Sequence, residues 1–302
     1  MSINPSRKVH ICYNKYALLA FLSAAVINLS CVSLSPVSAN GELPGVFSSI
    51  ENTEPQWLPY AEGIDYFHGI VESPRLEYYA LRIDLSSPNI EIFINGGSQS
   101  TRVSSFVRDN NLTAGINAAP FSISSSMETQ PIRNIGIIVS NGVLMSAASS
   151  RYDALVFYRD KTAAIVSQSS ILSIENIENA IGGFFAILYS GQPAQRTITN
   201  EAAAVRHPRS AAGISAGGNQ LILLVIDGRR NGSVGATEQE TALLLRALGS
   251  WNGLNFDGGG SSAIAMLYPD GNVRVVNTPV HGGILGQERA VAGCIGVRVL
   301  NP

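Results

Sequence analysis

One stretch of the chain, Gln220 to Ile226, is almost entirely apolar. A strand of this kind has no polar face to turn toward water, so it belongs inside a sheet that is covered on both sides. The clearest helix signal follows: Thr237 and Glu240 form a capping-box pattern, leucines recur on one helical face, and Gly249 supplies a stop. The sequence therefore predicts a central sheet with helical packing.

The other strand signals are short and separated by turns. Tyr78–Leu85 and Ile90–Ile94 both alternate apolar and polar side chains around the Ser86–Asn89 turn, so we expect them to pair. The segment Thr101–Val107 predicts a short helix with a hydroxyl cap. The Asn141-Gly142 dipeptide predicts a hairpin. Further strands are expected at residues 134–139, 154–159, 163–167, 180–189, 263–268 and 273–276.

These elements predict an α+β fold with a mixed, largely antiparallel sheet and a few packed helices. Two segments also resemble each other, because a helix from Thr101 leads to Asn117 and a helix from Thr237 leads to Asn255. One interpretation is that the fold has two related strand-helix-strand halves whose Asn-bearing loops face one site. Chance similarity is the alternative.

The first 39 residues have the pattern of a secretory signal peptide. Arg7, Lys8 and Lys15 accompany an apolar run from Ala17 to Ile27, and small residues lead to Ala39. The run is too short to span a bilayer, which takes about 20 residues. We therefore expect residues 1–39 to be a signal peptide, 40–63 a linker and 64–302 one domain. The protein is expected to be secreted or periplasmic, with no transmembrane span in the mature chain.

Cysteine positions add one alternative to this interpretation. Cys31 lies just after the apolar run, where a lipid-anchored bacterial protein carries its acylated cysteine. Cleavage after Ala39 instead leaves Cys294 as the only cysteine, so no internal disulfide is expected. The apolar neighbours of Cys294 indicate a small buried residue.

Composition excludes two classes of protein. Charged residues make up only 14% of the chain, hydrophobic residues make up 45%, and the formal net charge is −2. Disordered proteins carry more charge and fewer apolar residues, and nucleic-acid-binding surfaces need a basic excess. We therefore expect a folded protein with no nucleic-acid partner. Its low charge is typical of an extracellular surface.

The most informative segment for function runs from Asn255 to Ser262 and contains three consecutive glycines. Glycines cost backbone entropy, so such a run needs a compensating reason. One reason is an anion site, in which successive N–H groups and the Ser261 and Ser262 hydroxyls bind a phosphate. Asp257 would then act as an acid, base or nucleophile. A tight turn or a calcium-type loop without catalysis is the alternative.

This segment, Asn-Phe-Asp-Gly-Gly-Gly-Ser-Ser after a helix that stops at Gly249, resembles the signature of the phosphodiester glycosidase domain family. Further segments agree with the family in the same order, namely Gly115–Phe121, Arg209–Ile214, Ile226–Arg229, Thr237–Gly249, Asn277–Pro279 and Glu288-Arg289. The resemblance covers about residues 64–300. In one departure, Ala118-Ala119-Pro120 replaces the family's usual glycines after Asn117, which makes that loop stiffer.

The resemblance implies an exported hydrolase that cleaves a sugar-1-phosphodiester into free sugar and a phosphomonoester. It implies catalytic roles for Asp257, Asp227 and Glu240, with Asp257 as the first choice. The residues expected to bind substrate are polar, basic and glycine positions of the matching motifs, namely Asn117, Arg209, Arg229, Asn255, Gly258, Gly259, Gly260, Ser261, Ser262, Asn277, Glu288 and Arg289. Arginines suit this substrate because a guanidinium donates two parallel hydrogen bonds to phosphate oxygens.

Several of these residues also have structural interpretations. Glu240 is the third helical residue of a capping box, and Asp227 can simply end a buried strand at a turn. Glu288 and Arg289 can form an exposed charge pair, and Asn277 can shape a turn.

Further candidates around the site are less constrained. His281 lies in a glycine-rich loop and is a candidate acid. Phe121, Trp251 and Tyr268 are candidates for stacking on a sugar, with core packing as the alternative. A divalent cation is compatible with oxygen donors such as Asp257, but nothing in the spacing requires one.

Two other functions stay open on the sequence alone. One is a non-catalytic surface module that binds polysaccharide or a phosphate-bearing cell-wall polymer through the same groove. It differs from the hydrolase at Asp257, because anion binding gains nothing from a nearby carboxylate. The other is a phosphodiesterase that cleaves the phosphorus–oxygen bond and leaves sugar 1-phosphate. The sequence does not identify the sugar, the acceptor or the oligomeric state.

Overall fold

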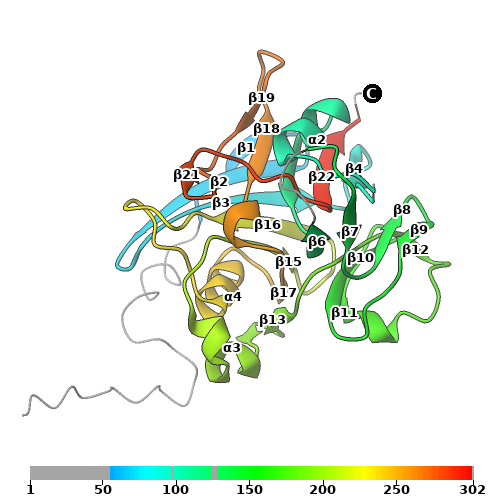
Figure 1. Cartoon of the computed structure of the whole chain (residues 1–302). Coiled ribbons are helices and arrows are strands. Elements are labelled where there is room, and N and C mark those ends of the chain that lie inside the picture. Colours follow the sequence, from blue (N-terminus) through cyan, green and yellow to red (C-terminus); the bar gives the residue numbers. More distant parts are fainter. Residues whose placement is uncertain (1–54, 97, 124–127, 301–302) are drawn as a thin grey trace, which may run out of the picture. The chain divides into compact units, whose positions relative to one another are not determined.

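The computed structural model describes residues 55–96, 98–123 and 128–300 (Figure 1). The expected signal peptide, Cys31 and most of the expected linker lie outside these residues. Every strand ladder in the described part is antiparallel, and the structure is mainly β with three α-helices. The expected α+β class thus holds with more strand than helix. None of the described helices combines the length and apolar character that a membrane span requires.

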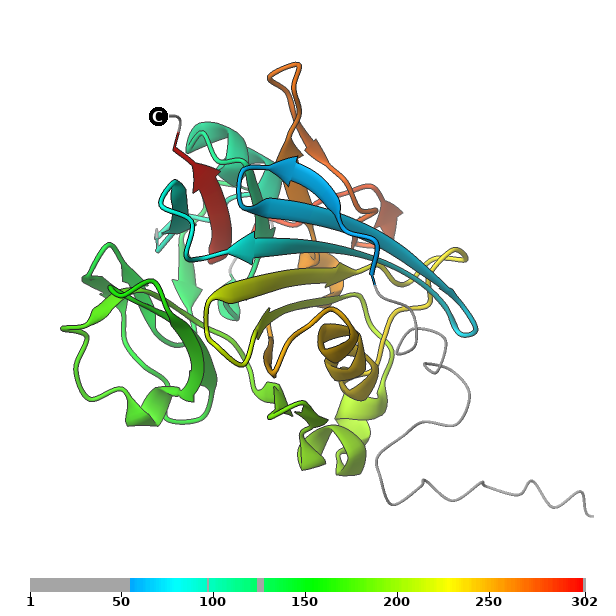
Figure 2. The ribbon, with the colours of Figure 1, turned by 180° about the vertical axis from the view of Figure 1, so that it is seen from behind.

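The largest sheet has eight strands and faces the viewer in Figure 2. In spatial order they are β1 (Leu58–Ala61), β2 (Ile64–Glu72), β3 (Arg75–Asp84), β16 (Gln220–Ile226), β15 (Arg209–Ile214), β17 (Asn252–Asn255), β13 (Ala186–Tyr189) and β14 (Gln192–Pro193). β16 lies inside this sheet, and its side chains alternate between two separate apolar clusters. The expectation of a central strand covered on both faces is confirmed.

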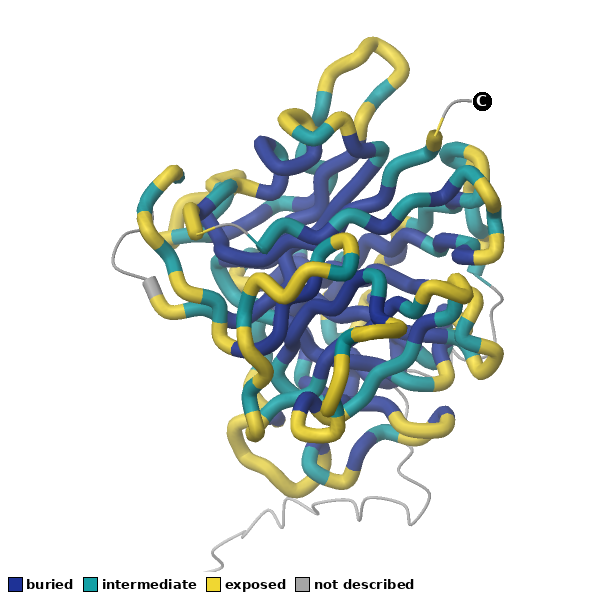
Figure 3. Tube along the Cα trace, turned by 90° about the vertical axis from the view of Figure 1, so that its right-hand side faces the viewer, coloured by how far each residue is buried: buried dark blue, intermediate teal, exposed yellow. Residues whose placement is uncertain are grey.

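The second sheet has five strands. In spatial order they are β19 (Val273–Val275), β18 (Ile264–Leu267), β5 (Ala114–Asn117), β22 (Cys294–Val299) and β4 (Ile90–Ile94). Its inner face packs on the large sheet through a shared apolar core that includes Leu223 and Val225 on one side and Ile116 and Ile295 on the other. Figure 3 shows the buried part of the trace in the middle of the molecule, with the exposed part mainly at its periphery.

Helices cover the outer faces of both sheets. α4 (Glu238–Ala247) packs on the large sheet through Leu243, Leu244 and Leu245, next to the short α3 (Gln195–Thr199) and the 3-10 turn η2 (Glu201–Ala204). α2 (Val103–Asp109) packs on the second sheet through Phe106. The layers are therefore helix, sheet, sheet, helix. The sequence-predicted capping box of α4 is present, because the Glu240 N–H donates to the Thr237 hydroxyl and the Thr237 N–H donates to the Glu240 carboxylate.

A third sheet is inserted between the two-stranded ladder β6 (Phe121–Ile123) and β7 (Ile132–Asn134) and strand β13. Its strands in spatial order are β11 (Ala163–Ser167), β10 (Asp153–Tyr158), β12 (Ile177–Gly182), β8 (Ile138–Ser140) and β9 (Val143–Ser146). The expected Asn141-Gly142 hairpin joins β8 to β9, with positive φ at both residues.

A buried amide fastens the base of this inserted sheet. Gln168, in the 3-10 turn η1 (Gln168–Ser170), is inaccessible to solvent. Its Oε1 accepts hydrogen bonds from the backbone N–H groups of Ile137 at 2.9 Å and Ser149 at 2.7 Å, and its Nε2 donates to the Asp153 carbonyl at 2.9 Å. The Gly182 N–H also bonds the Ile137 carbonyl, so the chain enters and leaves the sheet at one place.

Several sequence expectations about the elements are wrong. The expected strand at residues 134–139 is divided between the end of β7 and the start of β8. The segments expected to pair, β3 and β4, lie in different sheets, because the turn between them carries the chain across the sandwich. The expected strand 180–189 is two strands, β12 and β13, interrupted by Gly183. The sheet begins at Leu58 rather than at residue 64, because β1 pairs with β2.

The two segments with similar sequence have the same local topology. β4, α2 and β5 form one strand-helix-strand unit whose strands both flank β22. β16, α4 and β17 form another whose strands both flank β15. A common origin of these units stays a prediction.

Candidate functional site

Strand ends from both large sheets meet at one edge of the sandwich. β5 ends at Asn117, β17 ends at Asn255, and β16 ends immediately before Asp227. The glycine loop, defined here as residues 257–262, follows β17 and includes the 3-10 turn η3 (Gly259–Ser261), drawn in orange in Figure 1. It connects the large sheet to β18 of the second sheet.

Close backbone contacts explain the glycines of this loop. The Gly259 N–H donates to the Pro208 carbonyl at 2.8 Å, and a Cβ on Gly258 would lie 2.7 Å from the same oxygen. Gly259 has a φ of +63°, which disfavours a side chain. A Cβ on Gly260 would lie 3.0 Å from Nδ1 of His281. The loop is thus pressed against two neighbouring segments.

Asp257 opens the loop and is held by its backbone. Its N–H donates to the Ala118 carbonyl at 2.9 Å, and its carbonyl accepts from Asn117 Nδ2 at 2.6 Å. Burial raises the pKa of the Asp257 carboxyl, although Ser261, Arg289 and the Gly258 backbone act in the opposite direction. The backbone of Asp257 is therefore held in position, and its carboxyl binds its proton more tightly than an ordinary aspartic acid does.

Three buried polar atoms of this cluster have no hydrogen-bond partner among the described residues. They are Oδ2 of Asp257, Oγ of Ser262 and Nε of Arg289. Buried polar atoms are nearly always paired in folded proteins, so an unpaired group of this kind needs an explanation. A carboxylate oxygen, a hydroxyl and a guanidinium N–H together offer both acceptors and donors to a polar ligand.

Two arginines border the glycine loop. Arg289 Nη1 lies 3.3 Å from Ser261 Oγ, and its guanidinium stacks 4.7 Å from the centre of the Phe121 ring. Arg229 is exposed, with a φ of +59°, and its Nη2 lies 2.9 Å from the position that a Gly259 Cβ would take. These guanidiniums give the loop a positive rim.

Two histidines lie on neighbouring segments. His281 is in β20 (Val280–His281), which pairs with β21 (Ile284–Leu285) beside the loop, and His207 precedes Pro208. Desolvation lowers the pKa of His281, and Arg289 adds to this effect. Desolvation followed by Arg209 and Arg229 lowers the pKa of His207. Both imidazoles therefore favour the neutral form more than a free histidine does.

Asn117 lies behind the loop as a buried connector. Its Nδ2 bonds the Asp257 carbonyl, and its Oδ1 accepts from Ser210 Oγ at 2.7 Å and from the Ala263 N–H at 3.2 Å. The residue is inaccessible to solvent. The structure thus places this predicted ligand as a support that ties β5, β15 and the loop together.

Asp227 and Asn277 form a second connector. Asp227 Oδ1 accepts from Asn277 Nδ2 at 2.9 Å, and Oδ2 accepts from Arg230 Nη2 at 2.7 Å. The Thr278 N–H lies 3.1 Å from both oxygens, and Asn277 Nδ2 also bonds the Ser262 carbonyl. Burial raises the pKa of Asp227, and its hydrogen bonds oppose this in part. This predicted catalytic carboxylate already has its partners and lies behind the glycine loop.

Arg230 extends this connector to the N-terminal end of β3. It also pairs with Glu77, which accepts a hydrogen bond from Tyr79 at 2.9 Å and contacts His68 at 2.8 Å. The sequence motifs point to neither Arg230 nor Glu77. Arg230 directly follows the predicted ligand Arg229, and this doublet, of which one member need not face the site, was the available signal.

Glu240 and Arg209 lie at the start of α4. Glu240 Oε2 accepts from the Thr237 N–H at 2.9 Å, and Oε1 pairs with Arg206. Arg209 is buried and donates to the Ala236 carbonyl at 2.9 Å and the Val205 carbonyl at 2.8 Å. Burial lowers the Arg209 pKa. Both side chains are engaged in holding the helix and its leading loop, as the structural interpretation of Glu240 anticipated.

The side chains of Glu288 and Asn255 also lie away from the rim of the glycine loop. Glu288 Oε1 accepts from the Ser104 N–H at 3.1 Å, so it caps α2 from a distant segment. The N-cap residue Arg102 makes no side-chain cap, so the expected hydroxyl cap of this helix is wrong. Asn255 is buried, its backbone bonds the Phe184–Phe185 segment, and its Oδ1 has no partner among the described residues.

The sequence profile described as phosphodiester glycosidase matches residues 110–298. The chain belongs to the phosphodiester glycosidase family. The matched range contains the glycine loop, both arginines of its rim and the two connectors behind it. The expected family resemblance is confirmed.

One curated relative has a sequence match over part of the family domain. It is the SPbeta prophage-derived uncharacterized protein YomE of Bacillus subtilis, which is 28% identical over 141 residues. The match covers 44% of this chain and 22% of YomE, so the chain spans about a fifth of that relative.

Solved structures show that the fold is shared. The zebrafish N-acetylglucosamine-1-phosphodiester alpha-N-acetylglucosaminidase catalytic domain, described as auto-inhibited by its pro-peptide, superposes with a TM-score of 0.61 at 19% identity. The superposition covers 82% of this chain and 86% of that domain. A hypothetical protein from Synechocystis gives a TM-score of 0.61 at 15% identity over 81% of this chain and 64% of that one.

Within the described ranges, no group of three or more His, Cys, Asp and Glu side chains is arranged to hold a metal ion. Among the aromatic candidates, Phe121 lies at Arg289, whereas Trp251 packs on Gly191 and Tyr268 on Arg274. Cys294 is fully buried and its pKa is raised by burial.

Proposed function

We propose that the chain is an exported hydrolase that cleaves a sugar-1-phosphodiester to free sugar and a phosphomonoester. The observation that carries the proposal is the group of unpaired buried atoms on Asp257, Ser262 and Arg289 beside the glycine loop. Family membership supports the reaction class. Export rests on the sequence pattern of residues 1–39, which the structure does not describe.

The phosphodiester fits the charge of the loop. It carries one negative charge, which the guanidiniums of Arg229 and Arg289 can match together with the N–H and hydroxyl groups of residues 258–262. The sugar then lies toward Asp257. Phe121, held by Arg289, supplies an apolar surface at this edge.

Asp257 acts in this proposal as the base for the attacking water. The water oxygen bonds to the anomeric carbon, its proton passes to Asp257, and the carbon–oxygen bond to phosphate breaks with its electron pair on the phosphate oxygen. The leaving phosphate is stabilised by the arginines, so no second carboxyl is required to protonate it. This agrees with the position of Asp227, whose oxygens are occupied by other partners.

Asp257→Asn tests the assignment. We expect the variant to lose about 100- to 10,000-fold in kcat, the usual contribution of a positioned acid or base, and to remain folded. The assay uses N-acetylglucosaminyl-α-phosphoryl-methyl mannoside and a panel of bacterial glycosyl phosphodiesters, with products identified by mass spectrometry.

The products distinguish the competing functions. Free sugar that disappears in Asp257→Asn supports the glycosidase, whereas sugar 1-phosphate identifies a phosphodiesterase instead. Binding of the panel without any product, equal in the wild type and the variant, contradicts catalysis and identifies a surface-binding module.

A further inference from the structure

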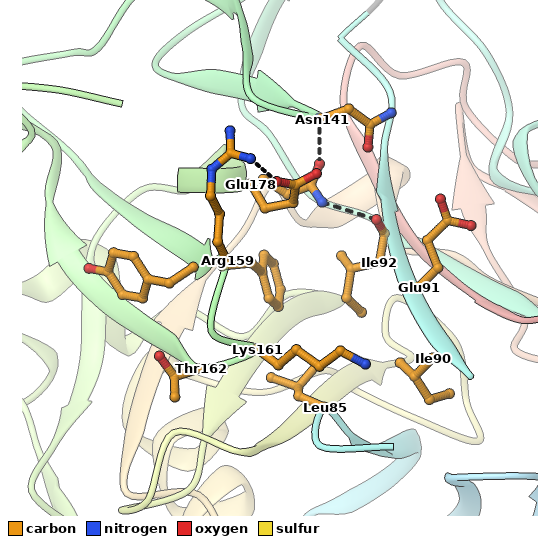
Figure 4. A pocket seen from close by; sticks show the side chains of 12 residues that line it. Leu85, Ile90, Glu91, Ile92, Asn141, Arg159, Lys161, Thr162 and Glu178 are labelled. Carbon is orange, nitrogen blue, oxygen red and sulfur yellow. Dashed lines mark hydrogen bonds and ion pairs between the residues drawn. The ribbon is translucent and has the colours of Figure 1, made fainter. Parts of the chain in front are cut away.

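A cavity of about 350 Å³ lies between the inserted sheet and the edge strand β4 of the second sheet (Figure 4). The residues that line it come from β4 and the turn before it, from β10 and the turn after it, from β12 and from the β8–β9 turn, and none belongs to the glycine loop. Its volume lies at the lower end of the range for small-molecule sites and suits about one to two sugar rings.

The floor of this cavity is apolar and rigid. Leu85, Ile90, Ile92 and Phe157 line it, and each has less than a tenth of its surface exposed. All four belong to the main apolar core, so the floor is held by packing on both large sheets. Such a surface accepts the C–H face of a ring.

The rim is polar and carries charges of both signs. Arg159 and Lys161 contribute positive charges and Glu178 a negative one, whereas Glu91 is paired with Arg298, which does not line the cavity. Figure 4 shows Arg159 and Glu178 paired at one side, where Nη1 and Oε2 are 3.3 Å apart. Lys161 Nζ, at the opposite side, donates to the Ser87 carbonyl at 3.0 Å.

Exposed hydrogen-bond donors and acceptors are therefore distributed around the rim of the cavity and do not form a patch of a single charge. More than half of the Arg159 side chain and about two fifths of the Glu178 side chain face solvent (59% and 41%). The exposed Asn141 adds an amide. This contrasts with the basic rim of the glycine loop, because the Arg159 guanidinium is paired with Glu178 and the Lys161 ammonium is bonded to the backbone carbonyls of Ser87 and Pro88.

We propose that this cavity is an accessory binding site for a neutral saccharide. A sugar ring places its apolar face on Ile90, Ile92 and Phe157, while its hydroxyls bond the Arg159–Glu178 pair and the Asn141 amide. Saccharide hydroxyls act as donors and acceptors at once, which matches a rim of mixed sign. The proposal concerns a site separate from Asp257 and does not require turnover there.

The test measures binding by amide NMR chemical shifts of the protein, with cellotriose, maltotriose and chitotriose as probes. At least one of the three is expected to give saturable shifts at the backbone amides of Asn141, Lys161 and Thr162. The same titration on Asp257→Asn is expected to give the same affinity. A failure of catalysis therefore leaves this result intact.

Variants decide whether the cavity itself binds. Glu178→Trp fills the rim from a strand and is expected to weaken binding at least about tenfold, or about 1.4 kcal/mol. Glu72→Trp, on the exposed part of β2, is the matched control and should bind as the wild type does. The double variant Arg159→Ala, Glu178→Ala removes the pair without changing net charge and should also weaken binding.

Three results would overturn the proposal. One is the absence of saturable shifts at these amides with all three saccharides. Another is unchanged affinity in both the Glu178→Trp variant and the double variant. The third is a site that binds inorganic phosphate in preference to the saccharides.

Discussion

Asp257 has an environment in which ionisation is costly, and this has consequences for pH dependence. Because burial raises its pKa, the folded protein binds this proton more tightly than the unfolded chain does. Between the unfolded pKa of about 3.9 and the higher folded value, stability contributed by this group falls as pH rises. The proposed base function, by contrast, requires the ionised carboxylate and strengthens over the same range.

We therefore expect opposite pH trends for activity and stability. kcat should rise with pH through the folded pKa of Asp257, and the melting temperature of Asp257→Asn relative to wild type should rise over the same interval. Thermal denaturation and initial rates measured from about pH 4 to pH 8 check both trends. A wild-type protein that gains stability over Asp257→Asn as pH rises would contradict the assigned shift.

Asn117 has a different role at the residue scale, because it holds three buried groups. Asn117→Ala leaves the Asp257 carbonyl, the Ser210 hydroxyl and the Ala263 N–H without this partner. We expect the free energy of unfolding to fall by about 2–4 kcal/mol, since each unsatisfied buried group costs about 1–3 kcal/mol and local adjustment recovers part of it. Urea denaturation measures the loss. Ser210→Ala removes only one of the bonds and should cost less, and equal stability of wild type and Asn117→Ala would show that the residue is a ligand alone.

At the start of α4, one variant distinguishes a helix-capping role of Glu240 from a catalytic one. Glu240→Ala removes half of the capping box and the partner of Arg206. We expect a loss of about 1–2 kcal/mol in stability, in line with other helix caps, and an unchanged kcat for the folded enzyme. Denaturation curves and kcat measured on the same preparation check this. A lower kcat with an unchanged free energy of unfolding would instead indicate that Glu240 is a catalytic residue.

The elements also show where sequence patterns are informative. Strong local signals, such as the capping box at Thr237, the Asn141-Gly142 turn and the apolar run of β16, are confirmed because each is decided by neighbouring residues. The pairing of β3 with β4 was wrong because their turn has the composition of a hairpin. Instead β3 pairs with its neighbour β2 and with the distant β16, and β4 pairs with the distant β22, which local sequence does not specify.

The same distinction applies to the site. The glycine loop and Asp257 were found because three adjacent glycines are unusual in any element. The supporting roles of Asn117, Asp227 and Glu288 could not be predicted, because a sequence motif does not distinguish a polar residue that supports the fold from one that binds a ligand. Their partners lie far away in the chain, as with Ser104 and Glu288.

At the scale of the whole molecule, Arg230 joins the two large sheets. It links Glu77 on β3 to Asp227, which in turn bonds Asn277 beside the second sheet. Arg230→Met leaves Asp227 buried without its cation, and breaking a buried pair in this way costs about 3–5 kcal/mol. Urea denaturation should show this loss, and Asp227→Asn combined with Arg230→Met should recover part of it.

A surface pair provides the control for this experiment. Arg82 and Asp65 are 2.7 Å apart on the same sheet, but about a third of each side chain is exposed (35% and 29%). Arg82→Met should cost less than about 1 kcal/mol. If Arg82→Met and Arg230→Met are equally destabilising, the Arg230 ion pairs between the sheets contribute no more to the free energy of unfolding than an exposed pair does.

The hydrogen bonds of the Gln168 amide have a consequence for the evolution of this protein. The chain enters and leaves the inserted sheet at Ile137 and Gly182, which are adjacent and bonded. Both chain connections of this sheet meet there, while its inner side chains pack on the main core and on β4. Its outer turns can therefore lengthen or shorten without altering the register of β5, β17 or the loop between β17 and β18. Recognition of new partners can therefore evolve at the edge of the molecule while the chemistry beside Asp257 is inherited unchanged.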